Sequence, residues 1–132
     1  AVQASALITA CRQAVQASAL IDRRMQEWSA SFEAQFGQPV DFGMGLHAGR
    51  AAVGRVGFEH TTTFTAVGEV VNTASRLQEY TKSAQARLVL SLEVARRAGV
   101  ADGLGEVRQV QVRGRSESLQ ALHVARPGLQ WP

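Results

Sequence analysis

Residues 42–79 read FGMGLHAGRAAVGRVGFEHTTTFTAVGEVVNTASRLQE, and this stretch decides the fold that the sequence predicts. Between positions 40 and 46, apolar residues alternate with glycine or polar residues, which predicts a strand with one apolar face. Residues 48–49 are typical of a tight turn, so we expect residues 51–56 to return as the hairpin partner of that strand. Residues 61–67 (TTTFTAV) are rich in β-branched side chains and predict a further strand.

A helix is expected to begin at Gly68 and to continue to about Tyr80. Asn72 and Arg76 are four residues apart and therefore project from one face of this helix. An amide and a guanidinium near a helix N-terminus suit a polyphosphate, because Arg gives bidentate charge-assisted contacts and the free N–H groups add positive potential. An ordinary solvated helix face explains the same spacing, so the residues alone leave both interpretations open.

Upstream, residues 1–36 contain neither Gly nor Pro, and apolar or small residues recur every three or four positions. This period predicts one long helix that ends at Gly37 and Pro39. The nearly strict alternation of three- and four-residue spacings also allows residues 1–36 to act as a partner helix, as in a coiled coil. Small residues at the inward positions favour close packing on a sheet instead.

Downstream, residues 87–90 predict a short strand, Ser91 a helix N-cap and Gly99 the end of that helix. Residues 107–112 and 118–124 predict a closing hairpin. The order of elements predicts an α+β fold with helices on one face of a mainly antiparallel sheet. We divide the chain into an N-terminal helix (1–39), a second part (40–126) and a loose tail (127–132).

Composition excludes several classes of protein. The 132 residues carry 14 basic and 11 acidic side chains, a formal net charge of +3. The cations are scattered, which argues against a nucleic-acid partner and against a polybasic membrane anchor. A single cysteine, Cys11, cannot form an internal disulfide, and with three His it cannot build a zinc site. We find neither an apolar run long enough to span a membrane nor a signal peptide, and we interpret the chain as a piece of a longer protein.

Two further segments are weak evidence of a functional site when each is taken alone. The glycines of GMGLHAG stand at positions 43, 45 and 49 and miss the GxGxxG pattern, so we interpret them as places where a strand passes close to another backbone. His47 within this segment is expected to be a packed or edge histidine. Arg113 and Arg115 flank a glycine at a predicted turn and could present cations to an anion.

Taken together, these segments resemble the catalytic domain of the class III nucleotidyl cyclases. That family reads as a strand ending in GIHxG, then VxGxxG, then YTxxGDxVNxAxRLE, in the order found in residues 42–79. VRGRSESLQALHV (112–124) resembles the family's final hairpin, KGxxEPxxxYxV. The resemblance implies the ferredoxin-like cyclase fold without its first strands and helices.

The resemblance also implies a mechanism. Class III cyclases bind ATP at the interface of a head-to-tail homodimer, where two ions, Mg²⁺ or Mn²⁺, are held by two Asp residues near the start of the domain. The ribose 3′-oxygen attacks the α-phosphorus, pyrophosphate leaves and cyclic AMP forms. By position, Asn72 matches the residue that orients the ribose, and Arg76 matches the arginine on the α-phosphate. Arg113 falls where a Lys usually grips the terminal phosphates, and Thr65 falls where the base is read, which favours adenine.

The departures from the family pattern concern the metal site. The strand and hairpin that carry the two metal Asp residues have no counterpart here, and neither Asp22 nor Asp41 lies in those motifs. We therefore expect no metal ligands in this chain, no cyclic AMP from the chain alone, and an active cytoplasmic homodimer as the parent. The alternative is a non-catalytic, cyclase-derived dimerisation or regulatory module. We also expect the chain to self-associate through exposed apolar surface or an open sheet edge.

Overall fold

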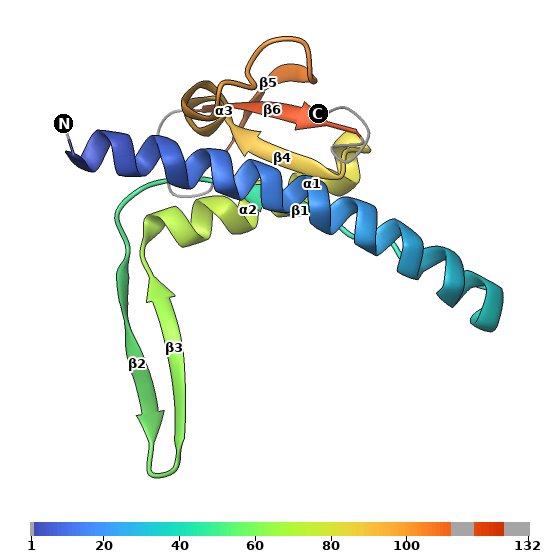
Figure 1. Cartoon of the computed structure of the whole chain (residues 1–132), viewed down its shortest axis with the longest axis horizontal. Coiled ribbons are helices and arrows are strands. Elements are labelled where there is room, and N and C mark those ends of the chain that lie inside the picture. The colour runs from blue at the N-terminus through green and yellow to red at the C-terminus, as the bar shows by residue number, and fades with distance from the viewer. Residues whose placement is uncertain (1, 112–117, 126–132) are drawn as a thin grey trace.

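The computed structural model describes residues 2–111 and 118–125, with side chains described from residue 4 onward. The helices and strands of the described residues are labelled in Figure 1. In order, they are α1 (Val2–Phe36), β1 (Met44–Leu46), β2 (Ala52–Phe58), β3 (Thr61–Val67), α2 (Glu69–Ala84), β4 (Leu88–Ser91), α3 (Leu92–Ala98), β5 (Glu106–Val110) and β6 (Leu119–Val124). The α+β prediction is confirmed.

The main sheet has four strands in the order β1-β4-β6-β5. β1 runs parallel to β4, whereas the β4–β6 and β6–β5 pairs are antiparallel, so the sheet is mainly antiparallel, as predicted. The predicted return of residues 51–56 onto the strand before them is wrong. β2 instead pairs with β3 over seven residue pairs and forms a separate two-stranded arm that extends away from the body of the molecule (Figure 1).

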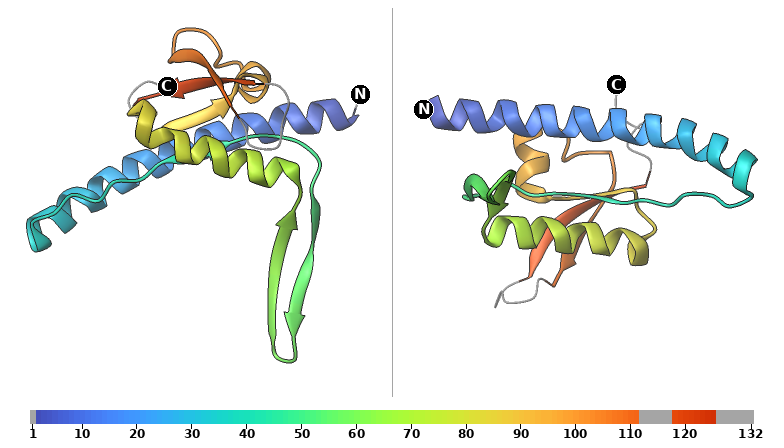
Figure 2. Two further views of the ribbon diagram at one scale, coloured as in Figure 1. Left: turned by 180° about the vertical axis from the view of Figure 1, so that it is seen from behind. Right: turned by 90° about the horizontal axis from the view of Figure 1, so that it is seen from below.

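Helices cover both faces of the sheet, so the prediction that they lie on one face is also wrong. On one face, Leu88 and Leu90 of β4 pack with Val94 of α3 and with Cys11 and other residues of α1. On the opposite face, Val89 of β4 packs against α2. Because side chains alternate along a strand, these two clusters lie on opposite sides of β4. The right-hand view of Figure 2 shows the strands between α1 and α2.

The expected long helix is confirmed as α1, and it ends where Gly37 adopts φ 75°. Cys11 and Ser18 are buried as the period predicts, but Ile21 and Trp28 are about half exposed. Trp28 belongs to the C-terminal half of α1, which extends beyond the sheet (Figure 1). Aromatic side chains along that half contact one another on the same helix. The ring centroids of Trp28 and Phe32 lie 5.3 Å apart.

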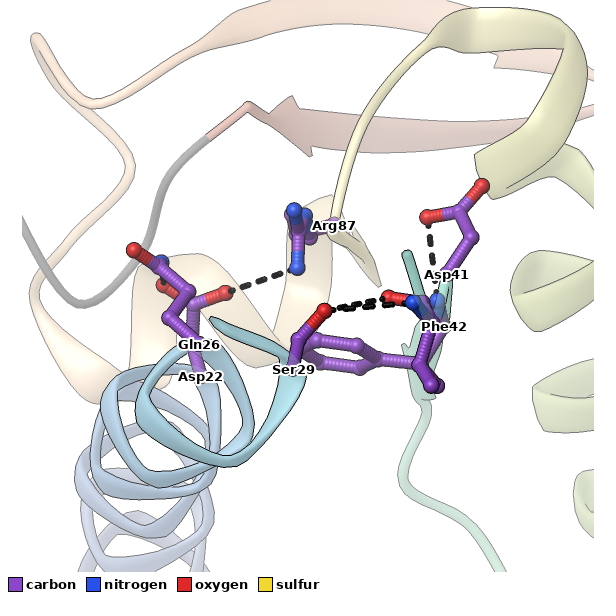
Figure 3. A network of polar contacts seen from close by, with 7 residues as sticks. Asp22, Gln26, Ser29, Asp41, Phe42 and Arg87 are labelled. Carbon is purple, nitrogen blue, oxygen red and sulfur yellow. Dashed lines mark hydrogen bonds and ion pairs between the residues drawn. The ribbon is translucent and has the colours of Figure 1, made fainter. Parts of the chain in front are cut away.

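A polar network connects the middle of α1 to Arg87, the residue directly before β4, and to the segment before β1 (Figure 3). Asp22 is fully buried and lies 3.9 Å from Nη1 of Arg87, whose guanidinium also stacks over the Phe42 ring. About two turns further along α1, the Ser29 hydroxyl donates to the Val40 carbonyl at 3.1 Å and accepts from the Val40 amide at 3.2 Å. These contacts hold residues 40–42 in an extended path beside α1, although this segment is not part of β1.

The predicted helix boundaries around α3 are confirmed. The Ser91 hydroxyl accepts from the backbone amide of Val94, and Gly99 ends the helix with φ 76°. The closing hairpin is also confirmed, since β5 and β6 pair over five residue pairs. The predicted tail at residues 127–132 lies outside the described residues.

Candidate active site

α2 carries two of the predicted site residues, and a glycine in β1 allows it to lie close to the sheet. A Cβ atom at Gly45 would lie 2.3 Å from the carbonyl oxygen of Ala74 and 2.5 Å from the amide nitrogen of Gln78. The interpretation of GMGLHAG as a strand that passes close to another backbone is therefore confirmed. His47, directly after β1, is half-buried, which fits an edge histidine.

Gly68 is the single residue between β3 of the arm and α2. It has φ 155° and accepts hydrogen bonds from the backbone amides of Val71 at 3.1 Å and Asn72 at 3.4 Å. No side chain caps this helix end. Asn72 therefore lies in the first turn of α2, where the positive end of the helix dipole favours a negatively charged group.

The structure brings Asn72 and Arg76 together on the outward face of α2. Thr73 and Leu77, at 1% and 0% exposure, point into the fold, whereas Asn72 is exposed and the Arg76 side chain is 33% exposed. The helical spacing predicted this arrangement from the sequence. An amide and a guanidinium one turn apart can together bind a sugar hydroxyl and a phosphate oxygen.

Glu79 is a neighbour that sequence reasoning missed. Nη1 of Arg76 donates to Oε2 of Glu79 at 2.8 Å, an i,i+3 ion pair on the same helix. The spacing of the two residues was the signal that could have revealed it. A guanidinium has five N–H donors, so this pair leaves donors of Arg76 for a phosphate group.

Thr65 lies apart from this helix face, on the arm. It pairs with Gly54 in the β2–β3 ladder and is the half-buried residue of β3, whose other six residues are exposed. Arg113 and Arg115 lie outside the described residues. The structure thus places two of the four predicted site residues side by side on α2 and the third on the arm that precedes it.

The residues present do not fit a metal site. Within residues 2–111 and 118–125, no group of three or more His, Cys, Asp or Glu side chains is arranged to hold a metal ion. Asp22 belongs to the buried network with Arg87, and the carboxylate of Asp41 accepts from the Phe42 amide at 3.0 Å. In the same part of the chain, no helix is long and apolar enough to cross a lipid bilayer.

Comparison with known proteins gives consistent matches. The sequence model described as "Adenylate and Guanylate cyclase catalytic domain" matches residues 2–122. An adenylate cyclase of Anabaena cylindrica is 25% identical over 118 residues, which cover 84% of this chain and 24% of that protein. A terminal-differentiation-specific adenylate cyclase of Dictyostelium discoideum is 31% identical over 88 residues, which cover 64% of this chain and 4% of that protein.

A solved structure, that of the guanylyl cyclase Cya2, superposes with a TM-score of 0.77 at 25% identity. The match covers 87% of this chain and 57% of the Cya2 chain. The chain therefore spans well under two thirds of each of these relatives.

Proposed function

Because the chain belongs to the adenylate and guanylate cyclase catalytic domain family, we propose that it is the C-terminal part of an adenylate cyclase catalytic domain. The complete domain would convert ATP to 3′,5′-cyclic AMP and pyrophosphate, as a signal. Two relatives that bear the name adenylate cyclase support this choice of nucleotide, while a guanylyl cyclase has a similar structure. The nucleotide is therefore the first point to test.

The observation that carries the proposal is the pair Asn72 and Arg76 on the outward face of α2. In the proposed reaction the ribose 3′-hydroxyl releases its proton to solvent, and its oxygen bonds to the α-phosphorus. The bond from that phosphorus to the bridging oxygen breaks, and pyrophosphate takes the electron pair. Asn72 would orient the ribose, so that the 3′-oxygen is in line with the leaving group.

Arg76 would bind the α-phosphate, where negative charge develops in the transition state. To do so, its guanidinium must share or release Glu79, the partner it holds in this structure. Mg²⁺ or Mn²⁺ in the complete domain would supply further charge, with ligands outside the described residues.

Two other residues complete the proposed contacts with the nucleotide. The hydroxyl of Thr65 can accept a hydrogen bond from the adenine amino group. Arg113 would bind the terminal phosphates in place of a lysine, with forked donors in place of a point charge. The same proposal places the domain in the cytoplasm, where ATP is available.

The β2–β3 arm supports a homodimer that forms through the catalytic interface. The arm exposes apolar side chains along both strands, including Phe58 at 85% and Phe64 at 70% exposure. Exposed apolar surface of this kind marks protein–protein contact sites. Because Thr65 lies on the arm, docking of the arm on a second copy would also bring Thr65 to the interface.

The test is a nucleotide assay on the complete domain that contains residues 1–132. Purified protein is incubated with ATP or GTP and with Mg²⁺ or Mn²⁺, and cyclic AMP and cyclic GMP are measured. Thr65→Cys is run in parallel, because a change of base preference would connect Thr65 to the nucleotide. Production of cyclic GMP alone would contradict the adenylate assignment. Binding of ATP without any product would favour the non-catalytic module.

A further inference from the structure

β5 forms one edge of the main sheet, at the opposite end from β1. In the strand order β1-β4-β6-β5 it is the end strand, and among the described strands it pairs with β6 alone. Residues 106–109 are exposed, so neither helix layer covers the first four residues of β5. Alternate residues of an edge strand direct their amide and carbonyl groups away from the sheet. β5 therefore presents main-chain groups to which a further strand can bind.

The two charged side chains of β5 lie on one face of the sheet. Val110 is buried in one cluster with Leu77 of α2. Because side chains alternate along a strand, Glu106 and Arg108 lie on this same face. Nη2 of Arg108 donates to Oε2 of Glu106 at 2.7 Å, and this hydrogen bond lowers the pKa of the Glu106 carboxyl. The Glu106 and Arg108 side chains remain 67% and 47% exposed, so each can contact a further partner.

The spacing of these charges determines what can pair with β5. Charged side chains on an edge strand usually prevent pairing, because like charges directly opposite each other are destabilising. When two copies of β5 pair antiparallel with Val107 opposite Val107, Glu106 of each copy lies opposite Arg108 of the other. The nearest registers that keep the same faces aligned are shifted by two residues, and they place either two Glu106 or two Arg108 side chains opposite each other. The charge pattern therefore favours one register of β5 with itself.

We infer that β5 is an interface between two copies of this chain, in which the two β5 strands pair antiparallel with Val107 at the centre. Each copy provides the same surface, so the contact closes as a two-fold dimer and joins two main sheets into one. The Val107 side chains, 43% exposed in the single chain, meet on the face opposite the ion pairs. Because cross-strand pairs each contribute modestly and the ladder is short, the contact is weak and depends on concentration.

The β2–β3 arm of a second copy is the competing partner for β5. β3 carries no charged residue, and the single charged residue of β2 is Arg55. Neither arm strand can therefore neutralise both Glu106 and Arg108 of an opposing β5, whereas a second β5 neutralises both. The inference concerns the sheet edge and does not depend on cyclase activity.

The experiment uses the purified 132-residue chain with Phe58→Ser and Phe64→Ser, which remove two exposed apolar side chains from the arm. This parent protein separates pairing of β5 from association through the arm. Sedimentation equilibrium measures association up to about 1 mM, the weak end of specific affinities. Amide hydrogen exchange followed by NMR, at low and high protein concentration, identifies the surface that becomes protected.

We expect the parent to form a dimer and the amides of β5 to exchange more slowly at high concentration. Glu106→Arg and Arg108→Glu each give β5 two like charges and should weaken association at least tenfold. The two substitutions combined in one chain again place unlike charges opposite each other and should restore association to within about threefold of the parent.

An equimolar mixture of the two single variants should associate at least tenfold more tightly than either variant alone. Both single variants lose the hydrogen bond between Glu106 and Arg108 within the strand, so rescue in the mixture cannot come from restored folding. Glu27→Arg, in an exposed ion pair on α1, is the matched control and should leave association unchanged.

A monomer at about 1 mM would overturn the inference, as would protection confined to the arm or to α1. Single variants that associate as the parent does would also overturn it, and so would a double variant as weak as the single ones. The exchange measurement is made on the parent and does not depend on the folding of any charge variant. Cyclase activity of the complete domain is measured separately, so its absence would leave this result unaffected.

Discussion

The contact between β1 and α2 gives the most demanding prediction. A Cβ atom at Gly45 would lie 2.3 Å from the Ala74 carbonyl oxygen, while real Cβ contacts stay above 3.0 Å, so Gly45→Ala must move α2 away from β1 by about 0.7 Å. The obstacle is helix backbone, which cannot rotate aside. Overpacking costs typically about 1–3 kcal/mol, and because two backbone atoms are involved we expect about 3 kcal/mol.

The assay is urea unfolding of the 132-residue chain followed by far-UV circular dichroism. Gly54→Ala is the matched control, because a Cβ atom there has no neighbour within 4 Å. We expect it to change the free energy of unfolding by less than about 0.5 kcal/mol. A Gly45→Ala protein as stable as the wild type would refute the argument that β1 holds α2 in place. Equal destabilisation by the two substitutions would refute it as well.

The remaining predictions concern stability. Asp22→Asn should lower the free energy of unfolding in urea by about 2 kcal/mol, because it leaves the partly buried Arg87 without its charged partner. Glu27→Gln, in an exposed pair, should lower it by under about 0.5 kcal/mol. Equal losses would contradict the role of burial. Ser91→Ala should cost about 1 kcal/mol through loss of the α3 N-cap, and an unchanged unfolding midpoint would show that the cap is dispensable. Burial lowers the pKa of the His123 imidazole, so the unfolded chain binds a proton more readily. Stability should therefore be complete above the unfolded pKa of about 6.5 and should decline as pH falls toward the lower folded pKa. In His123→Gln, urea unfolding at pH 7.5 and 5.5 should show a smaller difference than in the wild type, and an equal difference would contradict this.

Local patterns in the sequence predicted the elements well. The period of residues 1–36, the capping serine at position 91 and the glycine at position 99 each act within a few residues of chain, so they can be recognised without knowing the fold. The partner of β2 could not be predicted in this way. Residues 51–56 can pair with either neighbouring strand, and the local pattern does not distinguish the two. In the structure they pair with β3, while β1 pairs with β4, a strand about forty residues downstream.

The placement of helices on one face of the sheet was wrong for a different reason. Val89 lies between Leu88 and Leu90, and all three are fully buried, so β4 is apolar on both faces. A short apolar run of this kind indicates a strand covered on both sides, a signal that the sequence contains.

For the site, the i,i+4 spacing correctly placed Asn72 beside Arg76, because that relation is local. The position of Thr65 on a projecting arm depends on tertiary structure and could not be predicted from spacing.

In the proposed function, the outward face of α2 binds the substrate of a cyclase reaction. The most direct measurement is cyclic AMP formation from ATP by the complete domain, comparing wild type, Asn72→Ala, Arg76→Ala and the exposed control Ser83→Ala. We expect the first two variants to lose about 10²–10³-fold in kcat, the loss typical for removal of one group that stabilises transition-state charge, and the control to retain wild-type activity. Wild-type turnover in both the Asn72→Ala and Arg76→Ala proteins would contradict the account.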